Sequence, residues 1–339
     1  MSENLSFTKP DISYRAIARL AAPILVANIS IIGSGTIDTI MAGRLGAEHL
    51  AAVAIGNATV IMVILTLVGV IQSLSPLAGH HFGARRFERI GFELTQSLWL
   101  SLVLGLAILS ATDFWISLCN AQGNVARMLR IYLLASAASV PAFMLARPFV
   151  ALNAAVNLPR VTMWVSIGLL VLKGPLNYVF MYGLFGLPAL GGAGAGVSSA
   201  LGATVSLIAL YSYWRFSHVY DAMRPARIYL PNWQAIKTHL KIGVPISLSM
   251  FFEISSFALM AILIGRIGTI DVAAHQIVGN TTSFIYQAPL SLGIAVSVLV
   301  AQCLGAGSPT LARQAMIRVL RFALGIAAVT CSCLFLFRH

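Results

Sequence analysis

Two carboxylates lie inside long apolar stretches, where an ionisable group is costly. Glu253 sits in SMFFEISSFALM (residues 249–260), and no Lys, Arg or His occurs within eleven residues of it. Asp38 lies in IDTIMAG (residues 37–43). Burial raises the pKa of a carboxyl group, so such a group can exchange a proton near neutral pH or, when ionised, hold Na⁺ or an organic cation. These two residues therefore predict ion or cation binding.

Other polar side chains share a helix face with the acids or form a stripe nearby. Ser34 precedes Asp38 by four residues, and Ser249 and Ser256 flank Glu253 at i−4 and i+3. A second stripe with helical spacing consists of Gln276, Asn280, Ser283 and Gln287, and His275 beside it is a candidate for proton transfer. The alternative is that these groups only bond neighbouring helices together.

Asn177 and Lys173 lie one helical turn apart in a later apolar run, and Asn177 has the same depth in its run as Asp38 has in its own. Matching depth predicts contact between Asp38 and Asn177. The long Lys173 side chain could reach Asp38 as well. Alternatively, Lys173 lines a wet cavity, and the sequence leaves both readings open.

The composition indicates which elements carry these residues. Hydrophobic residues make up 58% of the 339 residues and charged residues 9%, against roughly 25% charged in soluble domains; mean hydropathy is +0.88. An all-α integral membrane protein is predicted, because nine runs are long enough to span a bilayer: 18–42, 50–78, 94–116, 129–150, 161–185, 193–214, 242–265, 272–303 and 319–337. The four cysteines show no paired spacing, and no nucleophile–base or metal-ligand spacing is present. We therefore expect no enzyme, no metal site and no cofactor.

The net charge of +12 follows the membrane topology rather than a nucleic-acid partner. Sixteen cations fall in the connections on the side of the N-terminus and five on the other side. The sixteen are Lys9, Arg15, Arg19, Arg85, Arg86, Arg89, Arg147, Arg160, Arg215, Arg224, Arg227, Lys237, Lys241, Arg313, Arg318 and Arg321. This bias predicts a cytoplasmic N-terminus.

The chain repeats itself at an offset of 222 residues. LAAPI (20–24) matches IGVPI (242–246), which pairs Pro23 with Pro245 as structural positions, and GRLG (43–46) matches GRIG (265–268). Six spans fall within one period, so both copies enter the membrane in the same direction. We expect a first lobe of six helices (1–214), a cytoplasmic linker (215–241) and a second lobe with three helices (242–339). Because the second copy stops after its third span, we also expect a C-terminal truncation of a twelve-span protein.

Several blocks together resemble multidrug and toxic compound extrusion (MATE) transporters, most closely their NorM-type branch. They are IDTIMAGRLGAEHLAAVAIG (37–56), GHHFGARR (79–86), GPLNYVFMYG (174–183), FFEISSFALMAIL (251–263) and VAAHQIVGN (272–280). The resemblance implies a two-lobe helical bundle in the bacterial inner membrane, a monomer, that exports cationic drugs or dyes in exchange for Na⁺ or H⁺. It assigns cation and substrate binding to Asp38, Asn177 and Glu253. This chain departs from the family at Lys173, where a second asparagine is frequent, and it ends before the acid expected in a tenth span.

Two other classes of function remain alternatives. A truncated fragment could be non-transporting or an accessory membrane subunit. A flippase for lipid-linked substrates, built on a related fold, would need a cationic cavity, whereas the predicted spans hold Lys173 against two acids.

Overall fold

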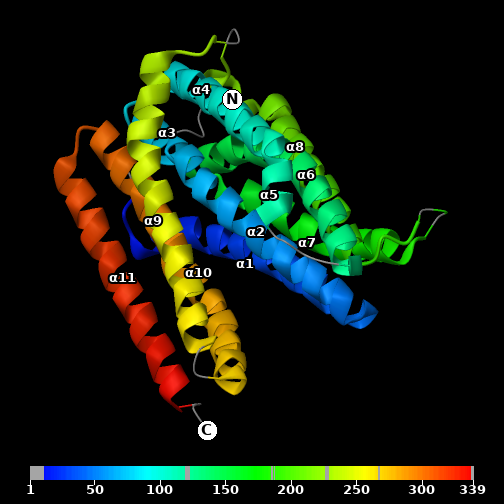
Figure 1. Cartoon of the computed structure of the whole chain (residues 1–339). Coiled ribbons are helices and arrows are strands. Elements are labelled where there is room, and N and C mark those ends of the chain that lie inside the picture. Colours follow the sequence, from blue (N-terminus) through cyan, green and yellow to red (C-terminus); the bar gives the residue numbers. More distant parts are fainter. Residues whose placement is uncertain are drawn as a thin grey trace.

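The computed structural model describes residues 11–118, 123–184, 186, 188–225, 229–265 and 268–336, and every regular element in them is helical (Figure 1). Nine helical segments of the described chain are long and apolar enough to cross a membrane. The predicted all-α membrane fold is therefore confirmed.

The helices follow the nine predicted runs, and most of them extend beyond a run at one or both ends. They are α1 (Tyr14–Leu45), α2 (Ala47–Gln72), α3 (Leu74–Gly83), α4 (Phe87–Ser110), α5 (Thr112–Leu118), α6 (Gly123–Ala155), α7 (Pro159–Tyr182), α8 (Gly194–Phe216), α9 (Trp233–Gly265), α10 (Thr269–Gly305) and α11 (Pro309–Leu336), with short 3₁₀ turns η1 (Gly191–Ala193) and η2 (His218–Met223). Pro159 and Pro309 open α7 and α11, since the fixed φ of proline suits the first helical position.

Polar residues at the helix ends explain why the apolar runs underestimate helix length. Helix α9 begins at Trp233, nine residues before its predicted run, and α4 begins at Phe87 rather than 94. Arg147, expected in a connection, lies within α6, half-buried, with its guanidinium carbon 4.5 Å from the Phe143 ring centroid. A cation can remain within a helix because an aromatic face attracts it.

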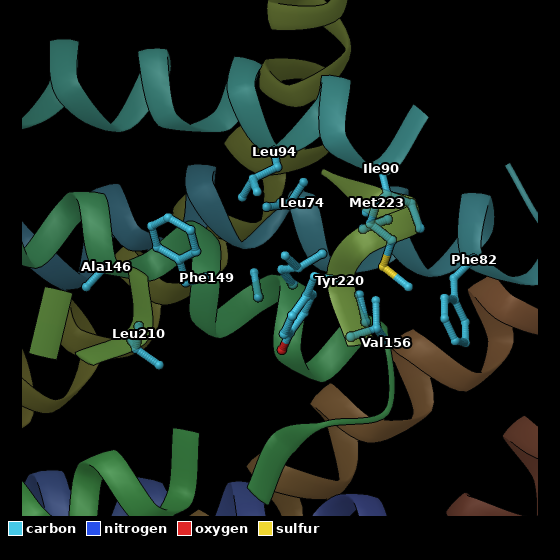
Figure 2. Packing of buried hydrophobic residues seen from close by; sticks show 14 residues of the cluster. Leu74, Phe82, Ile90, Leu94, Ala146, Phe149, Val156, Leu210, Tyr220 and Met223 are labelled. Atoms are coloured by element: carbon cyan, nitrogen blue, oxygen red, sulfur yellow. The ribbon is translucent and has the colours of Figure 1, made fainter. Parts of the chain in front are cut away.

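The helices of the first group, α1–α8, pack around several apolar clusters. In the largest, the Tyr220 ring of η2 lies among Phe149, Val156 and Met223 (Figure 2). The Tyr220 hydroxyl donates to Asn153 Oδ1 at 2.6 Å, and burial raises the pKa of that hydroxyl above its usual range. The connection after α8 is thereby fixed to the first group.

The second group, α9–α11, meets the first group at one end, which we name the joined end and define by residues 69–83, 239–247 and 298–305. Helix α2 packs on α9, and α10 packs on α3 and α1. A Cβ on Gly69 would lie 2.6 Å from Ser247 Cα, and one on Gly243 would lie 2.6 Å from Val70 Cα. Only glycine allows the two backbones to come this close. Away from the joined end, α9 and α11 run apart from α2 and α7 (Figure 1).

A buried polar cluster also holds the joined end together. The His239 side chain of α9 is fully buried, with Nε2 3.1 Å from Glu93 Oε2 and Nδ1 2.9 Å from Ser73 Oγ. His81 Nε2 lies 3.8 Å from the other Glu93 oxygen. Glu93 was not predicted to lie inside a span, because the apolar run there was taken to begin one residue later.

Candidate ion and substrate site

Asp38 of α1, Asn177 of α7 and Lys173 of α7 form one buried group. Asn177 Nδ2 donates to Asp38 Oδ1 at 2.6 Å, and Lys173 Nζ lies 3.0 Å from the same oxygen. Asn177 is fully buried, and Asp38 and Lys173 are 8% and 7% exposed. The contacts expected from matching depth are therefore present, and Lys173 is paired with the acid rather than lining a wet cavity.

Helix α8 supplies the other partners of Lys173. Its ammonium donates to Ser199 Oγ at 2.6 Å, to Ser198 Oγ at 3.1 Å and to the Ala195 carbonyl at 3.4 Å. Ser198 also donates to Asn177 Oδ1. Ser198 and Ser199 were not predicted as site residues. The signal for them is a pair of hydroxyls shortly after a glycine-rich segment that enters a span.

That glycine-rich segment, GGAGAG (191–196), brings α8 close enough for these contacts. A Cβ on Gly194 would lie 2.6 Å from the Phe180 carbonyl carbon, and one on Gly196 would lie 2.9 Å from the Tyr132 carbonyl oxygen. Helix α8 therefore contacts the backbones of α7 and α6. Tyr132 itself is buried and lies within electrostatic range of Asp38.

Glu253 has a different environment. It is half-buried on α9, and the Tyr286 side chain of α10 lies within electrostatic range of its carboxylate. Ser249 and Ser256 on the same face are exposed, and the Ser256 hydroxyl donates to the Phe252 carbonyl of its own helix. Tyr286 was missed because an aromatic residue in an apolar run gives no distinct signal.

Three of the remaining predicted side chains bond within their own helices. Ser34 donates to the Ser30 carbonyl within α1. Ser283 donates to the Gly279 carbonyl and Gln287 to the Ser283 carbonyl, both within α10. Half-buried His275 is on α10, Pro23 is buried and Pro245 is exposed. The side chains of Gln276 and Asn280 lie outside the described residues.

Comparison with known proteins identifies the family to which this arrangement belongs. The sequence model of the MatE family matches residues 23–179 and 245–339. The chain belongs to the MatE family. Its resemblance to the NorM-type branch is also confirmed: a probable multidrug resistance protein NorM of Aromatoleum aromaticum is 39% identical over 311 residues, covering 88% of this chain and 66% of the relative. The multidrug resistance protein NorM of Vibrio parahaemolyticus is 33% identical, covering 86% of this chain and 64% of the relative.

The chain thus spans about two thirds of the length of these MatE relatives. Solved structures share the fold at lower identity. The eukaryotic MATE transporter AtDTX14 matches with a TM-score of 0.82 at 23% identity, covering 95% of this chain and 72% of that one. A MOP superfamily transporter from Pyrococcus furiosus matches with a TM-score of 0.84 at 22% identity and the same coverage. At these identities the likeness shows the fold alone.

Proposed function

We propose that this MatE chain is part of a multidrug efflux antiporter that exports cationic compounds in exchange for Na⁺ or H⁺. The observation that carries the proposal is that each group of helices holds a carboxylate within a membrane-spanning helix, Asp38 on α1 and Glu253 on α9, apart from Glu93 of α4, which is bonded to His239. Intramembrane acids are costly and mark ion or substrate pathways. The relatives named multidrug resistance protein support the substrate class.

The transport cycle is alternating access, in which the two groups of helices rock against each other. A cationic drug and a coupling ion compete for the same carboxylates, and each ligand stabilises a different arrangement of the groups. The joined end is the contact that must open in one of these arrangements. The protein acts as a monomer in the bacterial inner membrane with a cytoplasmic N-terminus, in line with the distribution of Lys and Arg.

Flippase activity has less support. A phosphate headgroup requires a surplus of positive charge, whereas the Lys173 ammonium is paired with Asp38 at 3.0 Å.

The test reconstitutes the 339-residue chain in liposomes and follows ethidium efflux under an imposed Na⁺ or H⁺ gradient. We expect Glu253→Gln to reduce efflux to the level of empty liposomes, because the amide keeps the size of the side chain and removes its charge. The matched control is Glu88→Gln, at an exposed acid in the first turn of α4. Full efflux by the Glu253→Gln chain would refute the assignment, and no efflux by the unmodified chain would favour the non-transporting alternative.

A further inference from the structure

The Lys173 ammonium is coordinated in the way a protein coordinates a metal cation. Four oxygens surround Nζ: Asp38 Oδ1 at 3.0 Å, Ser199 Oγ at 2.6 Å, Ser198 Oγ at 3.1 Å and the Ala195 carbonyl at 3.4 Å. A carboxylate, hydroxyls and a carbonyl are also the ligands that hard cations prefer. An ammonium has three donors, and this cradle satisfies all of them.

We propose that Lys173 is a tethered cation that occupies the place of a coupling ion at Asp38, so that the first-lobe site is closed to Na⁺. The proposal rests on the proposed function, which makes Asp38 a cation-binding residue. It adds a statement about which cations the site accepts, because the negative charge of Asp38 is already balanced by the Lys173 ammonium.

Charge balance is the physical reason for the exclusion. The Asp38–Lys173 pair is neutral, and its two side chains are 11% and 8% exposed. Adding Na⁺ would leave one unbalanced positive charge in a buried region, at a cost that excludes it unless other interactions compensate. Na⁺ contributes only its charge, whereas an organic cation also buries apolar surface, which is favourable.

Lys173 keeps other partners when a substrate binds Asp38. The contact between Nζ and Asp38 Oδ1 is one of four, and the other three are to α8: the hydroxyls of Ser198 and Ser199 and the Ala195 carbonyl. The ammonium can therefore release the carboxylate and keep most of its partners. Asn177, one turn along the same helix, still donates to Asp38 at 2.6 Å and holds the carboxylate in place.

The test measures thermal unfolding of the purified full chain in detergent, in Na⁺ and in N-methylglucamine buffers, with Glu253→Gln present throughout so that only the first lobe responds. With Lys173 in place, we expect the same Tm in both buffers. Lys173→Asn leaves the buried Asp38 carboxylate without a balancing charge, so the Tm of this variant should fall in N-methylglucamine. The Tm of the same variant should recover by about 5 °C when the Na⁺ concentration exceeds the Kd for Na⁺ a hundredfold. The double variant Asp38→Asn/Lys173→Asn removes both charges and should not respond to Na⁺.

The proposal is overturned if Na⁺ raises the Tm while Lys173 is present, or if the Lys173→Asn chain does not respond, including failure to fold in either buffer. As a second measurement, binding of radioactive Na⁺ to the Glu253→Gln chain should be absent, and saturable binding would contradict the proposal without any change at Lys173. Neither experiment uses drug transport. A failed efflux assay therefore tests the proposed function, and an unexpected Na⁺ response tests the role of Lys173.

Discussion

His239 offers a direct test of how the joined end is held. Its ring is fully buried between the two groups of helices, 3.1 Å from a Glu93 oxygen and 2.9 Å from the Ser73 hydroxyl. His239→Leu replaces the ring with an apolar side chain of similar size and removes both contacts. The Glu93 carboxylate, 12% exposed, would retain His81 at 3.8 Å, which is too long for a hydrogen bond.

The expected loss of stability follows from these contacts. A hydrogen bond to a charged group contributes about 1.5–3 kcal/mol and a neutral one about 1 kcal/mol. The Ser73 hydroxyl keeps an acceptor, because it donates to the Val70 carbonyl at 2.7 Å. Burial of the leucine side chain returns about 1–2 kcal/mol. The net destabilisation is therefore about 2 kcal/mol, which corresponds to a Tm lower by about 4 °C.

The assay is thermal unfolding of the purified chain, with a double-mutant cycle through Glu93→Leu to isolate the coupling between the two side chains. We expect a coupling energy of about 2 kcal/mol. The matched control is His218→Leu: His218 Nδ1 lies 3.3 Å from Asp221 Oδ2, but both side chains are exposed, so the Tm should not change. Equal Tm values for His239→Leu and the unmodified chain, with no coupling in the cycle, would show that this cluster does not stabilise the joined end.

Two further substitutions test the close contacts elsewhere. Asn177→Leu removes the 2.6 Å bond to Asp38, so the free energy of unfolding should fall by about 2 kcal/mol. Asn28→Leu removes a 3.4 Å bond to the Ser291 hydroxyl and should lower the free energy of unfolding by less than about 1 kcal/mol. Equal losses of Tm in the two variants would contradict this interpretation. Gly243→Ala places a Cβ 2.6 Å from the backbone of α2 and should destabilise by about 1–3 kcal/mol. Gly202→Ala, with nothing within 4 Å, should be neutral or stabilising by up to about 1 kcal/mol, so equal effects of both alanines would refute close backbone packing.

The sequence predicts the fold class of this chain well, because hydropathy alone identifies helices that cross a bilayer. It predicts the helix ends poorly. The first turns of α9 carry Lys237, His239 and Lys241, which end an apolar run although the helix continues through them. The polar His239 side chain is retained in the helix because it bonds to Glu93 of α4, a partner 146 residues away in the chain. The local sequence around either residue does not indicate that two residues so far apart in the chain will bond.

The candidate site follows a similar pattern. Asp38, Asn177 and Lys173 were found because polar groups in apolar runs are rare, and matching depth was enough to predict their contact. Ser198 and Ser199 were not found, because serine is common in membrane helices and its role here depends on the close approach of α8 to α7. Whether these residues bind ions or drugs stays a prediction.

The internal repeat shows that the two acids are not equivalent. At the 222-residue offset Asp38 corresponds to Met260, and Glu253 corresponds to Ile31. Within the repeat, Glu253 is therefore seven residues nearer the start of its helix than Asp38, which corresponds to about 10 Å along a helix. Met260 and Ile31 are 51% and 47% exposed. In the repeat, the position of each acid is thus occupied in the other copy by an exposed apolar side chain. An organic cation carries charge and apolar surface together, so we expect it to contact both kinds of side chain, whereas we expect an inorganic ion to contact only the carboxylates.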